Sequence, residues 1–290
     1  DTGRLLAVGQ KAADMIGRNP DSITVVKPMR SGVISDFTAT KAIVRVLLYK
    51  VCKNMVFKPN IVVCMPSTVT NLEKRTILDL VTAAGAGRAC LIEEPLAAAL
   101  GAGLDTRRPM GTMVVDIGGG TADIAVVTMG SISISKSVKI AGNILDEDII
   151  RYLRRERNIV IGEKTAESIK KRIGCAYLRD TELAIGIKGK HYITGMPITD
   201  EVNTTEVYLA MREHLEAIAE GVRSVLEVTP PELAGDISET GILLTGGGAL
   251  LRGLDKLIAA ETRIPVLVAE SPLDCVVDGT GICLEHPLDK

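Results

Sequence analysis

Short apolar runs alternate with segments of helical period through the first hundred residues. Residues 61–65 and 88–92 are predicted to be buried strands, because each is a brief apolar run bounded by loop signals. The segment between them is predicted to be a helix that starts with a capping box, in which the Thr70 and Glu73 side chains satisfy free N–H groups. Residues 38–51 have the apolar spacing of another helix. Strands that alternate with helices indicate an α/β layer.

Residues 113–127 are predicted to form two buried strands joined by a glycine turn. Asp116 closes the first strand, and the turn consists of Gly118, Gly119, Gly120 and Thr121. Glycines let the backbone approach a bulky anion, and consecutive N–H groups can form an anion-binding concavity. Asp116 is placed to hold hydrated Mg²⁺, which prefers one or two carboxylates plus phosphate oxygens. The alternative is an ordinary tight hairpin with glycines at positive φ, and this stretch alone does not separate the two.

A second strand–glycine stretch covers residues 241–254. An apolar strand leads into Gly246, Gly247 and Gly248, and a helix is predicted over residues 250–262. Such a junction presents N–H groups and the positive end of a helix to an anion or a flat ring. The stretch has neither the Gly-Lys-Ser/Thr of a P-loop nor the Gly-x-Gly-x-x-Gly of a dinucleotide fold.

Two acids stand where a strand is predicted to meet a helix in residues 90–103. Glu93 and Glu94 follow the apolar run, and Pro95 takes the first position of the helix. An acid at this junction favours the helix dipole. Alternatively, it orients a water molecule against a phosphate.

The second half of the chain adds charged helices and one small hairpin. Residues 162–174 are predicted to be helical, and Glu167 pairs with a lysine one turn later on a charged surface. Residues 182–194 alternate like a hairpin whose turn lies at Gly189. Residues 203–226 are predicted to be a long helix with a second capping box.

Three of these stretches, in this order, resemble the actin-like ATPase superfamily, and within it the MreB family of bacterial cytoskeletal proteins. Residues 92–99, 115–121 and 244–254 look like the family's catalytic, second-phosphate and adenosine motifs. The resemblance extends nearly end to end. It implies an α/β actin-like ATPase fold with two α/β halves around a nucleotide cleft and a small subdomain on each half. The implied division is 1–29 as a remnant of the first small subdomain, 30–108 as the first core, 109–145 with 209–278 as the second core, 146–208 as the second small subdomain, and 279–290 as a return to the first half.

The start of the chain departs from the superfamily pattern. The superfamily opens with a phosphate loop of the form Asp-x-Gly-Thr, whereas Asp1, Thr2 and Gly3 lead into a run that resembles a later family segment. The chain therefore looks like a fragment whose first half is incomplete at the N-terminus. We expect ATPase activity from the complete protein and weak ATP binding and hydrolysis from this chain alone.

The resemblance also implies roles for single residues. Glu94 would orient the attacking water, Asp116 would hold Mg²⁺ through water, and Glu167 and Lys170 would meet the ribose and adenine. A loop between two lysines would insert into the membrane, although a loop tucked against the core is the alternative. The remaining implied contacts are Gly118, Gly119, Gly120 and Thr121 with the phosphates, Gly246, Gly247 and Gly248 with the adenosine, and Met55, Val56 and Phe57 with the membrane.

The function implied by the resemblance is that of an ATP-dependent filament that directs cell shape and cell-wall synthesis. Its cofactors would be ATP and Mg²⁺. Its partners would be other copies of itself, the inner-membrane surface and membrane proteins of cell-wall synthesis. It would be cytoplasmic and peripheral on the inner face of the cell membrane. The alternatives are a chaperone-type ATPase domain, a sugar kinase on the same fold, and a degenerate structural partner without nucleotide.

The amino-acid composition supports the predicted fold and argues against several other kinds of protein. The chain is 46% apolar and only 2% aromatic, which suits sheets covered by helices rich in Ala, Val, Ile and Leu. A formal net charge of -2 argues against general affinity for nucleic acid. The six cysteines are scattered without a Cys-x-x-Cys pair, and no apolar run approaches the roughly 18–20 residues of a membrane span.

Overall fold

The computed structural model of the protein describes residues 5–30, 32–52, 58–178 and 181–285. The chain divides into two compact units, Asp1–Val63 with Val69–Leu91, and Cys64–Thr68 with Ile92–Lys290. The elements in chain order are α1 (Gln10–Ala13), β1 (Met29–Arg30), β2 (Val33–Ile34), α2 (Phe37–Val51), β3 (Asn60–Met65), α3 (Asn71–Ala84), β4 (Arg88–Glu93), α4 (Glu94–Gly101), β5 (Thr112–Ile117), β6 (Ala122–Thr128), β7 (Ser131–Val138), α5 (Gly142–Arg157), β8 (Ile159–Val160), α6 (Glu163–Ile173), β9 (Ala184–His191), β10 (Pro197–Asn203), α7 (Thr204–Glu227), α8 (Pro231–Thr240), β11 (Ile242–Thr245), the 3₁₀ turn η1 (Gly247–Leu250), α9 (Leu254–Thr262), β12 (Val266–Val268) and α10 (Cys275–Glu285).

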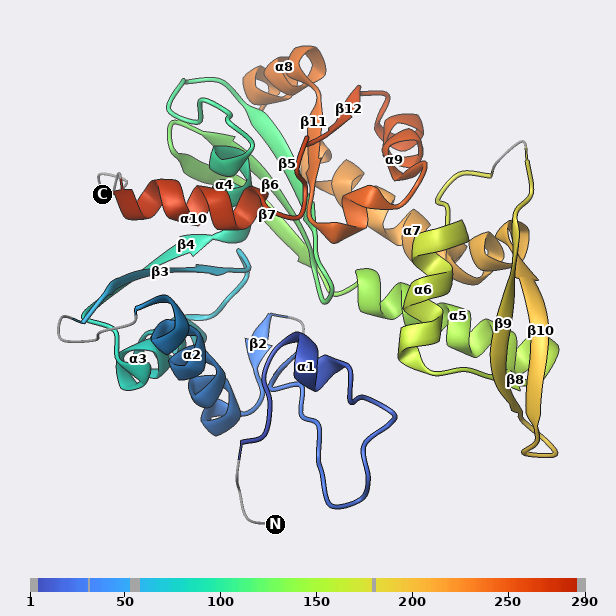
Figure 1. Ribbon diagram of the computed structural model, residues 1–290. Helices are drawn as coiled ribbons and strands as arrows, with labels where there is room; N and C mark the ends of the chain where they lie inside the picture. The colour runs from blue at the N-terminus through green and yellow to red at the C-terminus, as the bar shows by residue number, and fades with distance from the viewer. Residues whose placement is uncertain (1–4, 31, 53–57, 179–180, 286–290) are drawn as a thin grey trace. The chain divides into compact units, whose positions relative to one another are not determined.

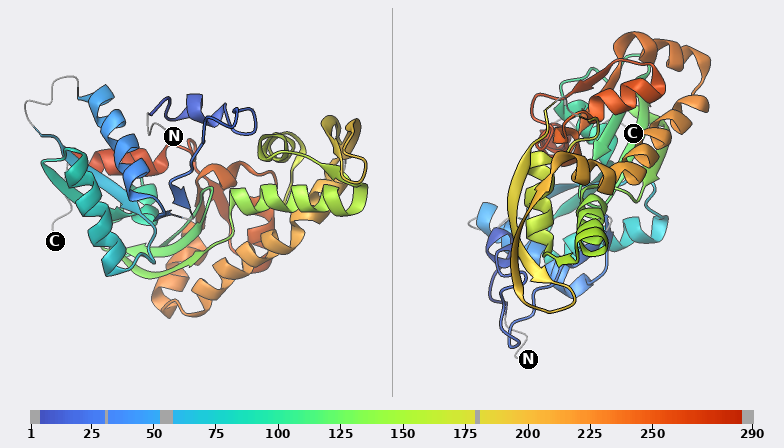
Figure 2. Two further views of the ribbon diagram at one scale, coloured as in Figure 1. Left: turned by 90° about the horizontal axis from the view of Figure 1, so that it is seen from below. Right: turned by 90° about the vertical axis from the view of Figure 1, so that its right-hand side faces the viewer.

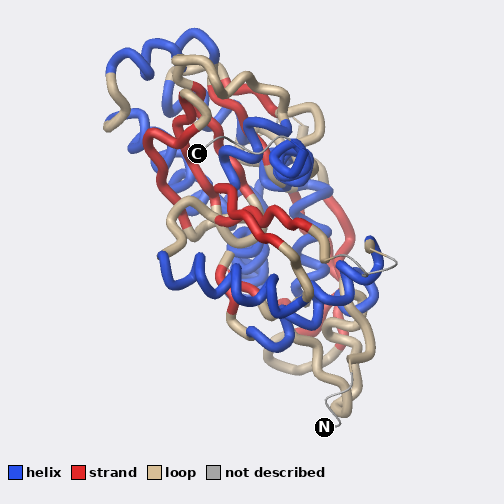
Figure 3. Tube along the Cα trace, turned by 90° about the vertical axis from the view of Figure 1, so that its left-hand side faces the viewer, coloured by secondary structure: helices blue, strands red, loops and turns tan. Residues whose placement is uncertain are grey.

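The first unit is built around α2, α3 and the pair of strands β3 and β4. The buried side chains of Leu80 and Val81 pack with Val44 of α2 and Ile61 of β3. The predicted capping box is present at the start of α3, where the Thr70 N–H donates to Glu73 Oε2 at 2.8 Å. Residues 14–28 are turns and loop (Figure 3).

The second unit contains a five-stranded sheet with the order β12-β11-β5-β6-β7. Strand β11 runs parallel to β5 and β12, whereas β6 is antiparallel to both β5 and β7. Alternate residues of β5 face opposite layers, as the pleat requires. Met113 and Val115 join the main core with α7, while Val114 packs with Ala99 of α4 and Cys275 of α10. Helices therefore cover both faces of this sheet (Figures 1 and 2).

A smaller sheet, with the order β10-β9-β8, belongs to the same unit. Helices α5, α6 and α7 contact one another beside it, and their buried residues continue the main core without a break. The second capping box is also confirmed, because the Asn203 N–H donates to Glu206 and the Glu206 N–H donates back to Asn203.

The predicted hairpin over residues 182–194 is wrong. Strand β9 continues through Gly189, which lies opposite Ile198 of β10, so the turn falls at residues 192–196. A Cβ at Gly189 would lie 2.7 Å from the Val160 carbonyl oxygen. Glycine is therefore needed here because β8 approaches closely, and not because the chain turns.

Helix α4 packs against β5, β6 and α10 within the second compact unit. The small buried side chains of Ala97, Ala98 and Ala99 allow this close packing. The division implied by the resemblance, into 1–29, 30–108, 109–145 with 209–278, 146–208 and 279–290, stays a prediction.

Candidate functional site

The glycine turn between β5 and β6 adopts the predicted strand–turn–strand form. The Gly118 N–H donates to the Thr121 carbonyl oxygen at 2.9 Å and closes the turn. None of its three glycines has a positive φ. A Cβ on Gly118 or Gly119 would make only ordinary contacts, at 3.6 and 3.5 Å. Neither turn geometry nor packing within the chain therefore requires glycine at these two positions, and a ligand that approaches the backbone would.

The carbonyl groups of the turn point into the first turn of α5. Gly118 O accepts from the Gly142 N–H at 3.1 Å, and Gly119 O accepts from the Asn143 N–H at 2.8 Å. Because a trans peptide is planar, the N–H that follows each carbonyl points the opposite way. The N–H groups of Gly119 and Gly120 are thus directed away from α5, and neither has a hydrogen-bond partner among the described residues. Outward N–H groups in succession suit an anion.

Three carboxylates cluster beside this turn, those of Asp116, Asp123 and Glu94. Asp116 on β5 and Asp123 on β6 are direct cross-strand partners, so both side chains emerge on the same face of the sheet. Asp116 accepts from the Thr245 hydroxyl of β11 at 2.9 Å. Asp123 is fully buried, and its two carboxylate oxygens have no hydrogen-bond partner among the described residues. Like charges directly opposite each other destabilise a sheet, so this pair calls for a functional explanation.

The pKa values of these groups reflect burial and mutual repulsion. Burial raises the pKa of Glu94, at the start of α4, to about 7, and the charges of Asp123 and Asp116 add to the effect. Burial raises the pKa of Asp116 to about 6, although the Thr245 hydrogen bond opposes the shift. The pKa of Asp123 is also raised by burial, which outweighs the nearby hydroxyl of Thr121. All three pKa values are raised because burial and like charges disfavour the ionised carboxylates. A bound cation would stabilise those ionised forms.

The carboxylate cluster fits a hydrated Mg²⁺. The Asp123 oxygens beside Asp116 accept no hydrogen bond of good geometry within the described residues, although the Thr121 and Ser137 hydroxyls lie near enough to lower the pKa of Asp123. No three His, Cys, Asp or Glu residues within the described ranges are placed to enclose a metal directly. Mg²⁺ keeps most of its water and takes one or two carboxylates plus phosphate oxygens, which matches this arrangement.

The second glycine run differs from its prediction. The predicted helix over 250–262 does not follow β11 directly, because η1 and three further residues precede α9. Gly246 has a φ of +78°, and its Cβ would lie 2.5 Å from the Ile117 carbonyl oxygen. A Cβ on Gly248 would overlap the Ile117 side chain. Gly247 is the exposed one of the three, and its Cβ would make a single tight contact, at 3.3 Å, with the end of the Leu273 side chain. Two of the three glycines therefore serve the packing of β11 on β5.

The two candidate residues on α6 point in different directions. Glu167 forms the predicted surface ion pair with Lys171 at 2.6 Å. Lys170 turns inward and places its Nζ 2.6 Å from the Gly142 carbonyl oxygen and 2.9 Å from Asp146. Lys170 thus lies beside the glycine turn, while Glu167 lies on the helix surface. Their contacts with ribose and adenine stay a prediction.

The structure brings several predicted site residues of the second unit together around the glycine turn, namely Glu94, Asp116 and Lys170. Asp123 and Asp146 lie beside them. Asp123 and Asp146 were missed by sequence reasoning. Asp123 follows Asp116 by seven residues across a four-residue turn, and this spacing makes the two residues cross-strand partners. The predicted membrane loop of Met55, Val56 and Phe57 lies outside the described residues.

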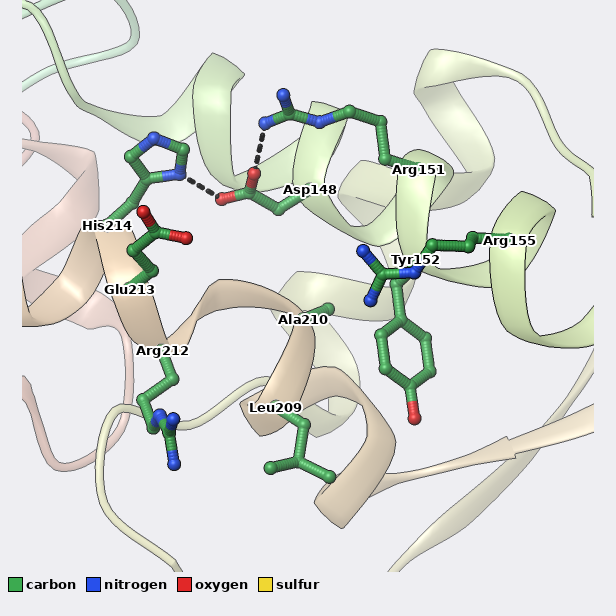
Figure 4. A pocket seen from close by; sticks show the side chains of 9 residues that line it. All are labelled: Asp148, Arg151, Tyr152, Arg155, Leu209, Ala210, Arg212, Glu213 and His214. Carbon is green, nitrogen blue, oxygen red and sulfur yellow. Dashed lines mark hydrogen bonds and ion pairs between the residues drawn. The ribbon is translucent and has the colours of Figure 1, made fainter.

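A separate pocket of about 420 Å³ lies between α5 and α7 (Figure 4). Asp148 accepts from His214 Nδ1 at 2.7 Å and also from Arg151, so the buried charge of this pocket is neutralised internally. It contains none of the glycine-turn residues. No helix within the described ranges is long and apolar enough to cross a membrane.

Comparisons with a family model, with known sequences and with solved structures all find MreB or Mbl proteins. A family model described as MreB/Mbl protein matches residues 1–289. The chain is 44% identical to the cell shape-determining protein Mbl of Bacillus subtilis (strain 168), covering 100% of this chain and 87% of that protein. It is 46% identical to the cell shape-determining protein MreB of Escherichia coli (strain K12), covering 96% and 81%. The crystal structure of MreB5 of Spiroplasma citri bound to ADP has a TM-score of 0.92 and 38% identity, covering 97% and 85%. The same protein bound to AMPPNP has a TM-score of 0.90.

Proposed function

The chain belongs to the MreB/Mbl family, and we propose that the complete protein binds ATP with Mg²⁺ and assembles into ATP-dependent filaments that determine cell shape. Its fold is the actin-like ATPase fold that the sequence resemblance predicted. Solved structures of a relative contain ADP or AMPPNP, which supports a nucleotide as the ligand.

The glycine turn is the single observation that carries this proposal. Its Gly119 and Gly120 N–H groups point away from α5, and contacts within the chain do not require glycine at Gly118 or Gly119. A polyphosphate offers several anionic oxygens that such N–H groups bind, and the adjacent carboxylates accommodate the cation that accompanies it. Thr121 adds a hydroxyl at the end of the turn.

The residues around the turn would share the work of phosphoryl transfer. Asp116 and Asp123 would hold Mg²⁺ through water, and the ion would neutralise charge on the phosphates. Glu94 would orient the attacking water, and its raised pKa suits a group that exchanges protons near neutral pH. Glu167 and Lys170 would meet ribose and adenine, with the exposed Gly247 beside the adenosine.

Nucleotide binding is tested by calorimetry with Mg·ATP on the full-length protein. Gly119→Val should bind far more weakly, because its Cβ would already lie 3.5 Å from the Asn143 side chain and its methyl groups would crowd the backbone that a phosphate must approach. Gly186→Ala is a matched control, since a Cβ there meets no atom within 4 Å. Equal affinity in Gly119→Val and the unaltered protein would refute the phosphate site.

Hydrolysis and assembly need separate measurements. Glu94→Ala should slow phosphate release by on the order of a hundredfold while it leaves ATP binding nearly intact, whereas Glu93→Ala should have little effect. Sedimentation with ATP distinguishes the classes of protein, because filaments pellet and a monomeric chaperone domain or kinase does not. A rate lost in Glu93→Ala and kept in Glu94→Ala would reverse the assignment.

We place the filaments on the inner face of the cell membrane, beside membrane proteins of cell-wall synthesis. The support is the sequence resemblance, which sets Met55, Val56 and Phe57 in a loop between lysines. Apolar tips enter the acyl boundary while lysines meet anionic headgroups, and a filament multiplies one weak contact.

A further inference from the structure

A partly buried ion pair stands directly behind the glycine turn. The side chains of Lys170 on α6 and Asp146 on α5 are only 14% and 13% exposed, and they approach to 2.9 Å. The same Lys170 ammonium donates to the Gly142 carbonyl oxygen at 2.6 Å. The pair therefore fixes α6 to the first turn of α5.

Gly142 links Lys170 to the glycine turn through two backbone hydrogen bonds. Its carbonyl oxygen accepts from Lys170, and its N–H donates to Gly118 O. The next residue, Asn143, donates to Gly119 O. A Cβ on Gly142 would lie 3.3 Å from both Gly118 O and Lys170 Nζ, so the contacts leave little room for adjustment.

We infer that Asp146 and Lys170 are positioning residues for phosphate binding, because they hold Gly142 where it orients the peptides of the turn. Asp146 keeps the ammonium against the Gly142 carbonyl, and Gly142 and Asn143 keep the Gly118 and Gly119 carbonyls turned inward. The N–H groups of Gly119 and Gly120 then point outward before any ligand arrives, which avoids a reorganisation cost on binding. This inference rests on the proposed nucleotide site but assigns Lys170 a role that requires no contact with the nucleotide.

Stability alone is a weak explanation for this pair. Removing two charges from water is costly, so a buried ion pair adds little net stability, and in some proteins such a pair fixes one geometry instead. The neighbouring pair of Lys171 and Glu167 stays on the surface of the same helix, with 70% and 48% of the side chains exposed. Lys171 therefore provides a matched control, one residue away and with the same charge.

Asp146→Asn is the decisive variant, tested beside Lys170→Met, the double variant and Lys171→Met. Asp146→Asn and Lys170→Met should each weaken Mg·ATP binding about tenfold or more, and the double variant should be no weaker than the worse single variant. Adenosine, which has no phosphate, should bind Asp146→Asn as it binds the unaltered protein. Lys170→Arg should recover most of the affinity, and Lys171→Met should lose none.

Three results would overturn the inference. Unchanged ATP affinity in Asp146→Asn would show that the pair does not set the turn. Equal losses for ATP and adenosine would indicate a general structural role. Amide chemical shifts of Gly119 and Gly120 in the ligand-free protein give a readout that needs no nucleotide: they should move in Asp146→Asn and stay fixed in Lys171→Met, and shifts that do not move would reject the inference. Failure of the unaltered protein to bind Mg·ATP would instead reject the proposed function, while these shifts still decide the positioning role.

Discussion

Replacing Glu94 with Gln should make the ligand-free protein more stable at alkaline pH and less sensitive to pH. Burial, together with the charges of Asp123 and Asp116, raises the pKa of Glu94 from its ordinary 4.5 to about 7. The folded protein therefore holds a proton on Glu94 over a range of pH in which the unfolded chain has released it. Gln keeps the shape of the side chain and never ionises.

The sign and size follow from proton linkage. Between pH of about 4.5 and 7 the folded state binds more protons than the unfolded state, so the free energy of unfolding falls as the pH rises. A shift of this size corresponds to about 3 kcal/mol between full protonation and full ionisation. For a domain of about 200 residues, each kcal/mol moves the melting temperature by about 2–4 °C. The Glu94→Gln substitution should thus raise the melting temperature by several degrees at alkaline pH and barely change it at the acidic end of this range.

Thermal unfolding of Glu94→Gln and the unaltered protein across this pH range tests the prediction, in a chelating buffer without nucleotide. The chelator matters because a bound cation stabilises the ionised carboxylates and would hide the effect. Glu93→Gln is the control, since Glu93 is not among the charges that shift the pKa of Glu94. Parallel pH profiles for Glu94→Gln and the unaltered protein would show that burial and the neighbouring carboxylates do not raise the pKa of Glu94 in the folded state.

The remaining predictions concern glycines and the membrane loop. Gly248→Ala should lower the melting temperature, because its Cβ would overlap a side chain of β5, and an unchanged melting temperature would contradict this role. Gly247→Ala should fold normally but lose affinity in a fluorescent-ATP titration, and full affinity would contradict a contact with the nucleotide. Gly189→Ala should cost about 1–3 kcal/mol in chemical denaturation because its Cβ would lie 2.7 Å from a carbonyl of β8, and Gly186→Ala should cost much less; equal costs would argue against the close strand approach. Phe57→Ser should reduce co-sedimentation of filaments with anionic vesicles, and undiminished pelleting would remove this loop from the proposal.

Local chemistry made several elements predictable from sequence alone. Both capping boxes, at Thr70 and Asn203, need only residues three positions apart, so the sequence contains the whole interaction. The hairpin around Gly118 was predictable for the same reason, because two apolar runs flank a short turn. The order of three such stretches carried the resemblance to the family, and the family model over residues 1–289 confirmed it.

Some assignments depended on neighbours that are remote in sequence. Gly189 looked like a turn residue, but the approach of β8 explains it. Gly246 and Gly248 need to be glycine because they pack against Ile117, which lies far earlier in the chain, and their contact with the adenosine stays a prediction.

The direction of Lys170 and the burial of Asp123 show the same limit at the candidate site. A sequence places Lys170 on a helix, but only the packing of α6 on α5 turns its ammonium toward Gly142. Alternation along β6 predicts which face Asp123 occupies, whereas complete burial of its carboxylate requires the helices and strands that cover that face. Periodicity and caps are local, and so the sequence alone determines them. Desolvation and the direction of a charged group arise from many remote contacts at once, and only the tertiary structure decides them.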